Sequence, residues 1–127
     1  MRGKYLYEYA VIRLFTKVES EEFINIGIIL FSKEANYIGM KYRSDVEQTC
    51  RTATELDFGL LGDTLKSFAI ICNGEKQGGK IAELEIAERF RWLTAERSTC
   101  IQTSRSHNGF TDNPENKLEE LFAELVM

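Results

Sequence analysis

The sequence predicts an α+β protein with a mostly antiparallel four-stranded sheet and helices packed on it. Near the N-terminus, three segments rich in aromatic and β-branched residues follow one another, which is typical of strands. Two later segments place apolar residues at helical spacing. The chain has 127 residues, 43% of them hydrophobic and 28% charged, which predicts one globular domain over residues 1–127.

The first three strands are predicted over residues 4–15, 22–32 and 37–43. The segments between them are short and polar, so an antiparallel meander is the simplest topology. Alternation along each strand predicts two faces. The expected core face carries these residues: Ala10, Ile12, Leu14, Ile24, Ile26, Ile28, Leu30, Ile38, Met40 and Tyr42.

The opposite face of this sheet combines aromatic, apolar and basic residues with an amide. Helices or a second copy of the chain are the favoured cover for it, because a large exposed apolar surface usually has a partner. The alternative is a groove for a ligand with bases or phosphates. The face carries these residues: Tyr5, Tyr7, Tyr9, Val11, Arg13, Phe23, Asn25, Gly27, Ile29, Phe31, Tyr37, Gly39, Lys41 and Arg43.

The helices follow from capping signals and apolar spacing. Ser44 and Glu47 have the capping-box form that starts a short helix. A helix from about residue 58 should stop at Asn73-Gly74, and one face of it carries Phe58, Leu61, Leu65, Phe68, Ala69 and Cys72. Further elements are expected over 85–93 (helix), 98–105 (fourth strand) and from 112–115 onward (last helix). The last helix should bury Leu118, Leu121, Phe122 and Leu125 after a cap at Asp112.

Residues 88–114 contain the only Trp, His and Pro of the chain, together with four arginines. Trp92 should be largely buried between Phe90 and Leu93. Ion pairing with the interleaved Glu85, Glu88 and Glu96 is the favoured role of the arginines, and anion binding is the alternative. The four are Arg89, Arg91, Arg97 and Arg105, the last two pointing to one face of the fourth strand.

His107 is expected to be a turn residue where the fourth strand leaves the sheet, in preference to a general acid or base oriented by Asp112. No nucleophile elbow, phosphate loop or zinc spacing occurs in the sequence, so we expect no metal or cofactor and more likely no enzyme.

Three scattered cysteines fit a reducing compartment. Without a signal peptide or an apolar span, a cytoplasmic protein away from membranes is expected. The net charge of −4 disfavours nucleic acid as a partner.

Several motifs resemble a bacterial family known only as the domain of unknown function numbered 3037. The motifs are Tyr9 with Arg13, Glu22-Phe23-x-Asn25-x-Gly27, Arg89-Phe90-x-Trp92-Leu93-Thr94-Ala95, Arg97-Ser98-Thr99 and His107-Asn108-Gly109. Prolines expected around the arginine strand are replaced by Glu96 and Arg105. The resemblance implies a small cytoplasmic bacterial protein with no established activity. It also implies a protein partner, since similar proteins are encoded beside kinases of the persistence-toxin type.

The leading hypothesis is therefore a non-catalytic binding or adaptor protein that acts through a protein partner, with a homo-oligomer left open. The alternative is a protein that binds or processes a phosphate ligand or nucleic acid through residues 89–109, and a hydrolase based on His107 ranks last. If the fourth strand pairs near the first, the family motifs converge on one face of the sheet. The candidate binding residues are then Arg13, Asn25, Arg97, Thr99 and His107.

Overall fold

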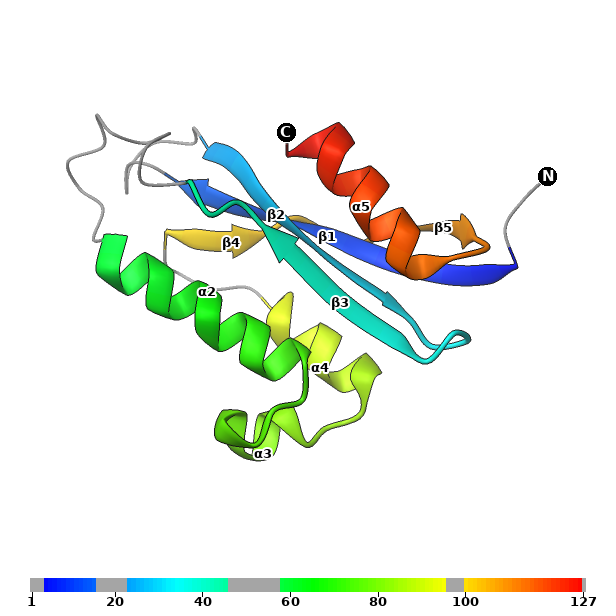
Figure 1. Ribbon diagram of the computed structural model, residues 1–127, viewed down its shortest axis with the longest axis horizontal. Helices are drawn as coiled ribbons and strands as arrows, with labels where there is room; N and C mark the ends of the chain where they lie inside the picture. Colours follow the sequence, from blue (N-terminus) through cyan, green and yellow to red (C-terminus); the bar gives the residue numbers. More distant parts are fainter. Residues whose placement is uncertain (1–3, 16–22, 46–57, 96–99, 127) are drawn as a thin grey trace.

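The computed structural model describes residues 4–15, 23–45, 58–95 and 100–126. An antiparallel sheet forms the middle layer, with helix α5 on one face and helices α2, α3 and α4 on the other (Figure 1). This confirms the predicted α+β class. The capping box predicted at Ser44 and Glu47 extends outside the described residues.

Strands β1 (Tyr5–Phe15), β2 (Phe23–Ser32) and β3 (Tyr37–Tyr42) form the predicted antiparallel meander. The strand order is β3-β2-β1-β4, with β5 also paired to β1. β1 is therefore the long strand on which both halves of the sheet are built.

The fourth strand differs from its prediction, because it is interrupted. β4 covers only Ile101–Thr103, and a fifth strand, β5, begins at His107 and runs to Thr111. The prediction that His107 lies in a turn where the fourth strand leaves the sheet is therefore wrong. His107 begins β5 and pairs with Tyr9 of β1. At the joint, the Ser104 amide donates to the carbonyl of Val11 (2.9 Å) and its Oγ accepts from the Val11 amide (2.9 Å). Ser104 thus continues the ladder along β1 where the strand itself stops.

A β-bulge in β2 changes which residues share a face. Ile12 opposes Gly27, but the next residue, Arg13, opposes Asn25, so Ile26 is the extra residue. The predicted common face from Ile24 to Leu30 is therefore wrong. Ile26, Ile29 and Phe31 pack with Ile12 and Leu14 in the core on the α2–α4 side, whereas Ile28 and Leu30 pack with Tyr7 and Val11 on the α5 side.

Gly27 lies next to the bulge at a point where three strands approach closely. A Cβ at this position would lie 2.8 Å from the carbonyl oxygen of Lys41 and 2.9 Å from Cβ of Tyr42. Any larger residue would therefore push β3 away from β2. The predicted faces of β1 and β3 are correct, since Ile38, Met40 and Tyr42 contact the same core as Ile12 and Leu14.

Helices α2 (Phe58–Cys72) and α4 (Ile86–Leu93) cover one face of the sheet, and a turn Lys76–Gly78 and α3 (Gly79–Ala82) connect them. α2 ends as predicted, because Gly74 has a positive φ of 68° and the Glu75 amide bonds the Ile70 carbonyl at 3.0 Å. On the predicted apolar face of α2, Leu61, Leu65, Phe68 and Cys72 are buried and Ala69 is half-buried.

Helix α5 (Pro114–Leu125) covers the other face. Its cap is Asn113, whose side chain accepts from the Asn116 amide at 3.1 Å, so the predicted cap at Asp112 is wrong by one residue. Pro114 then occupies the first turn, where a missing N–H costs nothing. The predicted core residues Leu118, Leu121 and Phe122 are buried, and Leu125 is half-buried.

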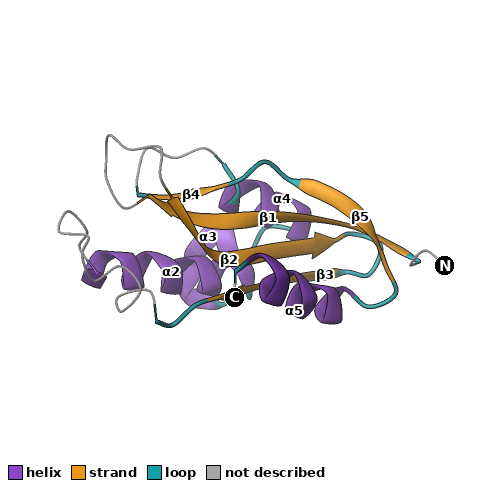
Figure 2. Ribbon diagram, turned by 90° about the horizontal axis from the view of Figure 1, so that it is seen from above, coloured by secondary structure: helices purple, strands orange, loops and turns teal. Residues whose placement is uncertain are grey.

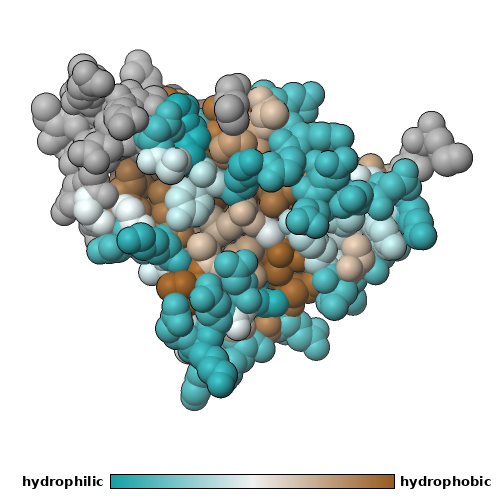
Figure 3. All heavy atoms as spheres, in the orientation of Figure 1, coloured by the Kyte–Doolittle hydropathy of each residue, from teal (hydrophilic) through white to brown (hydrophobic). Residues whose placement is uncertain are grey.

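α5 lies over the β2–β3 side of the sheet (Figure 2). On β1, Tyr7 and Val11 are still buried against it, whereas Tyr9 and Arg13 are half-buried and His107 of β5 is exposed. In the space-filling view, hydrophilic residues cover the helices above and below, and hydrophobic residues lie between them at the level of the sheet (Figure 3). On its own side of the sheet, α5 thus covers β2, β3 and the middle of β1.

Leu121→Ala tests the packing of α5. Leu121 is 5% exposed, so we expect its truncation to lower the free energy of unfolding by about 2–5 kcal/mol. Chemical denaturation measures this change. Glu124→Ala, on the exposed side of the same helix, is the control and should change stability by less than about 0.5 kcal/mol. Equal effects of the two substitutions would contradict the packing of α5.

Ser104→Ala tests the joint between β4 and β5. The substitution leaves the buried amide of Val11 without its acceptor, which should cost about 1–3 kcal/mol of unfolding free energy. Ser106→Ala is the control, since Ser106 is exposed. A Ser104→Ala protein as stable as the control would show that the joint does not depend on this hydroxyl.

Candidate functional site

The uncovered part of the α5 face contains three of the five predicted site residues. Arg13 and Asn25 oppose each other on β1 and β2, and His107 opposes Tyr9 on β5 and β1. Phe23 lies beside Arg13 and is 41% exposed. We call this surface the open strip: Tyr9, Arg13, Phe23, Asn25 and His107.

Arg13 is the central cation of the open strip. Its guanidinium carbon lies 4.4 Å from the centroid of the Phe23 ring, a cation–π contact. The Phe23 ring packs in turn against Phe15, with 5.3 Å between centroids. Phe15 thus supports the Phe23 ring, and that ring contacts the guanidinium from one side.

Two polar atoms of this corner are buried and have no hydrogen-bond partner, Nε of Arg13 and Oδ1 of Asn25. The other end of the Asn25 amide is used, because Nδ2 donates to the carbonyl of Leu125 at 3.0 Å. Asn25 therefore ties the C-terminal end of α5 to the sheet. A cation such as Arg13 is favourable near that end, where the helix dipole is negative.

Arg13 is not neutralised by a carboxylate of the described residues. The ion pairs found in this part of the chain join Lys41 to Glu119, Arg43 to Asp45 and Lys117 to Glu120. Arg13 takes part in none of them. An arginine that is stacked on a ring and unpaired offers planar donors to an outside carboxylate or phosphate.

His107 occupies the far end of the open strip. Its ring lies 5.3 Å from the ring of Tyr9, tilted by 33°. Tyr9 and Arg13 are four residues apart on β1, about 13 Å along the strand. His107 and Arg13 therefore share a face but do not meet at one point.

The remaining two predicted site residues, Arg97 and Thr99, lie outside the described residues. The structure therefore brings Arg13 and Asn25 together and places His107 on the same face. Sequence reasoning omitted Phe15 and Phe23 from the site. Their signal was the hairpin itself, since the residues at the ends of two paired strands become neighbours.

The arginines of segment 88–114 have different roles. Nη1 of Arg89 donates to the carbonyls of Ile71 (3.3 Å) and Cys72 (3.2 Å), so Arg89 caps the C-terminal end of α2. Gly74 makes room for it, because a Cβ there would lie 2.5 Å from Nη1. The ion pairs predicted with Glu85 and Glu88 are not among those found in the described residues.

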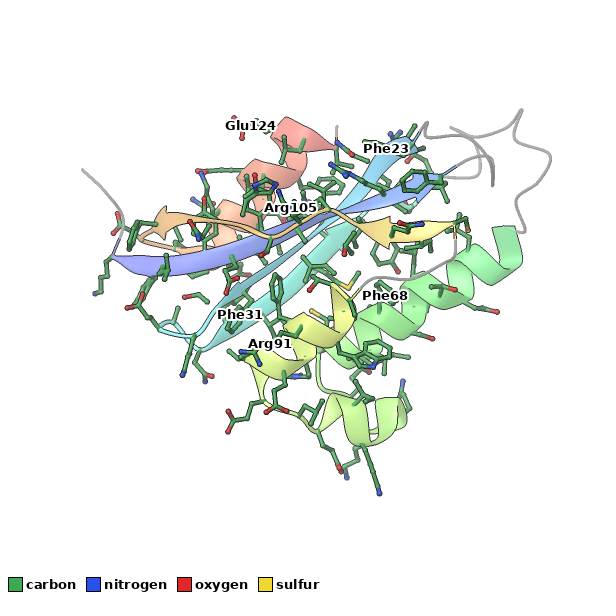
Figure 4. The ribbon with its side chains drawn as sticks, turned by 180° about the vertical axis from the view of Figure 1, so that it is seen from behind. Phe23, Phe31, Phe68, Arg91, Arg105 and Glu124 are labelled. Carbon is green, nitrogen blue, oxygen red and sulfur yellow. The ribbon has the colours of Figure 1, made fainter. Side chains whose placement is uncertain are left out.

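Arg91 and Arg105 are exposed and lie far apart in the molecule (Figure 4). Arg91 extends from α4, on the side of the sheet where Phe31 of β2 and Phe68 of α2 lie. Arg105 lies at the joint between β4 and β5, on the side where α5 carries Glu124. The arginines of this segment therefore do not form a single cluster.

The prediction that Trp92 is largely buried is wrong. Trp92 is 37% exposed, whereas Phe90 and Leu93 are 3% and 0% exposed. A step of two residues turns a helix by about 200°, so Trp92 points away from the core that Phe90 enters. Its ring instead contacts the edge of Phe68 on α2, with 6.4 Å between centroids.

Of the two cysteines in the described residues, Cys72 is buried and Cys100 is half-buried. Burial raises the pKa of the Cys72 thiol to about 12, and the nearby charge of Arg89 offsets only part of this rise. Burial also raises the pKa of Cys100.

Among the residues that the structure describes, no group of three or more His, Cys, Asp or Glu side chains could hold a metal ion. Within the same ranges, no helix combines the length and apolar character needed to cross a membrane.

Comparison with known proteins identifies the family. Residues 9–126 match the family described as "Protein of unknown function (DUF3037)". The chain belongs to this family. The family motifs thus lie in a defined setting: Arg13, Phe23, Asn25 and His107 along the open strip, and Arg89 under the end of α2. Searches of curated proteins and of solved structures found no match to the chain.

Replacing Arg89 and Arg91 separately tests their different roles. Arg89→Ala should lower the free energy of unfolding by about 1–3 kcal/mol, because it removes hydrogen bonds to two carbonyls at the end of α2. Arg91→Ala should change it by less than about 0.5 kcal/mol, since Arg91 is exposed. Urea denaturation compares the two. The reverse order of effects would show that Arg89 is not the cap of α2.

Proposed function

We propose that this protein is a non-catalytic binding or adaptor protein that contacts a protein partner through the open strip. The observation that supports this most is the Arg13 guanidinium, which is stacked on the exposed Phe23 ring. It forms no ion pair with a carboxylate of the residues that the structure describes. Arginine and aromatic residues dominate the binding energy of protein interfaces. A cation beside an exposed ring is therefore the expected chemistry of a partner contact.

The partner should present a carboxylate next to an apolar side chain. The carboxylate would accept hydrogen bonds from the planar Arg13 guanidinium, and the apolar group would cover Phe23. Asn25 would support this contact from beneath and would not touch the partner, because its Oδ1 is buried and its Nδ2 holds the carbonyl of Leu125.

Binding is proposed in preference to catalysis because of the position of His107. A histidine that activates a nucleophile of the protein lies within hydrogen-bond reach of that nucleophile. The His107 ring instead packs against Tyr9, at the far end of the strip from Arg13. The resemblance to proteins encoded beside persistence-toxin-type kinases suggests such a kinase as the partner, in the cytoplasm of a bacterium.

The alternative proposal is a phosphate-bearing ligand, including a nucleic acid. It is supported by the same unpaired Arg13, by the exposed Arg105, and by the Tyr9–His107 ring pair, on which a base could stack. The net charge of −4 favours the protein partner over this alternative, because general nucleic-acid binding draws on a basic surface.

Substitution of Arg13 tests the proposal. A partner captured from a bacterial host should be purified, and its affinity for wild type and variants measured by calorimetry. Arg13→Ala should weaken binding at least tenfold, corresponding to a loss of roughly 1.4 kcal/mol or more. Arg91→Ala is the matched control, an exposed arginine on the other side of the sheet, and should bind like wild type.

Two results would count against the proposal. If Arg13→Ala is folded and binds like wild type, the open strip is not the contact surface. If purified protein instead binds a single-stranded oligonucleotide in an Arg13-dependent and salt-dependent manner while no protein partner is captured, the phosphate alternative replaces the adaptor proposal.

A further inference from the structure

β5 forms an open edge of the sheet. In the described part of the chain, His107–Thr111 pairs with β1 and with no other strand. Edges of this kind carry unpaired backbone groups and are therefore sites at which another strand can add.

The hydrogen bonds of Leu6 show which backbone groups of β5 point outward. The Leu6 amide donates to Oε1 of Glu34 (2.6 Å) and its carbonyl accepts from Oγ of Ser32 (2.8 Å), both on the β2 side of β1. Because backbone groups alternate in direction along a strand, the N–H and C=O groups of Tyr7 point toward β5, where Tyr7 pairs with Gly109.

It follows that the residues of β5 on either side of Gly109 are not bonded to β1. Asn108 opposes Glu8, and Phe110 opposes Leu6, in the non-hydrogen-bonded pairs of the ladder. The N–H and C=O groups of Asn108 and Phe110 therefore point away from the sheet.

An exposed apolar pair lies beside this edge. Leu6 and Phe110 oppose each other and are 43% and 52% exposed, on the part of the face that α2 and α4 leave uncovered. The opposite edge strand, β3, carries Lys41, a residue type that discourages strand addition. β5 has no Lys, Arg, Asp, Glu or Pro between its ends, so nothing in its sequence blocks a further strand.

We propose that a second copy of the chain pairs with β5, antiparallel to it, about a two-fold axis at Gly109. This inference goes beyond the proposed function, and it does not depend on Arg13. The five residues of β5 are centred on Gly109, so the axis opposes Asn108 of one copy to Phe110 of the other. Each outward N–H then meets an outward C=O.

The side chains also match under this symmetry. Phe110 of one copy comes diagonally opposite Phe110 of the second copy, within reach of an aromatic ring, and Leu6 lies next to each. The exposed apolar pair of one copy thus covers that of the other.

Charges at the two ends of β5 favour the antiparallel arrangement. Arg105 precedes the strand and Asp112 follows it, and both side chains are exposed. Antiparallel pairing brings Arg105 of one copy toward Asp112 of the other, whereas parallel pairing would bring like charges together. Complementary charges of this kind fix the register of an interface.

The test compares two substitutions at Asn108. Asn108→Pro removes the outward N–H and leaves the bonds between β5 and β1, since proline is tolerated on edge strands. Asn108→Ala keeps the N–H and is the matched control. Multi-angle light scattering gives the mass of each protein. A concentration of about 100 µM is used, because an interface made by one pair of five-residue strands is small and small interfaces bind weakly.

Wild type and Asn108→Ala should have twice the 14.6 kDa mass of one chain, and Asn108→Pro should be monomeric, with at least tenfold weaker association. Arg13→Ala should remain dimeric, which separates this test from that of the proposed function. A monomeric wild type, or a folded Asn108→Pro protein that associates as tightly as Asn108→Ala, would overturn the inference.

A second variant keeps the test decisive if Asn108→Pro fails to fold. Phe110→Lys changes an exposed side chain and places two positive charges diagonally opposite each other across the proposed axis. Circular dichroism should show a native fold and light scattering a monomer. A Phe110→Lys protein that dimerises like wild type would refute pairing through β5.

Discussion

The bulge at Ile26 is the constraint on which the rest of the structure depends. Without the extra residue, Arg13 would oppose Ile26 and a cation would face an isoleucine across the ladder. With it, Arg13 opposes Asn25, and Ile26 joins the core beneath α2 and α4. One inserted residue therefore sorts β2 between two cores and creates the polar corner of the open strip.

The partial coverage by α5 then decides how much of that corner is accessible. α5 packs over β2 and β3 through Leu118, Leu121 and Phe122, and Asn25 holds its C-terminal end at Leu125. Arg13 opposes this same Asn25 on β1 and stacks on Phe23. The stability of α5 and the accessibility of the open strip are thus set by the same contacts, since a longer helix would cover the strip and a looser one would expose the core.

Sequence patterns predicted what local chemistry determines. The apolar spacing identified α2 and α5, and alternation identified β1 and β3 together with their faces. The bulge in β2 escaped prediction because alternating isoleucines fit either register, and only the pairing with Arg13 and Asn25 distinguishes them. The break at Ser104 was missed for a similar reason, because its hydroxyl replaces a backbone group only after β1 is in place.

The candidate site was predicted as far as strand pairing could be inferred. Arg13, Asn25 and His107 share a face as expected, because β5 pairs with β1. Arg89 was misjudged because its partners are carbonyls at the end of α2, which have no signature in the sequence. Trp92 was misjudged because its apolar neighbours, and not its own helical position, were taken as the guide.

The central claim is that the bulge divides the isoleucines of β2 between two cores, and methyl NMR tests it most directly. Nuclear Overhauser contacts should join the Ile28 methyls to the ring of Phe122 and the Ile26 methyls to Leu65 or Phe68. Contacts from both isoleucines to the same helix would contradict the account, because a regular strand would then replace the bulge and Arg13 would no longer oppose Asn25.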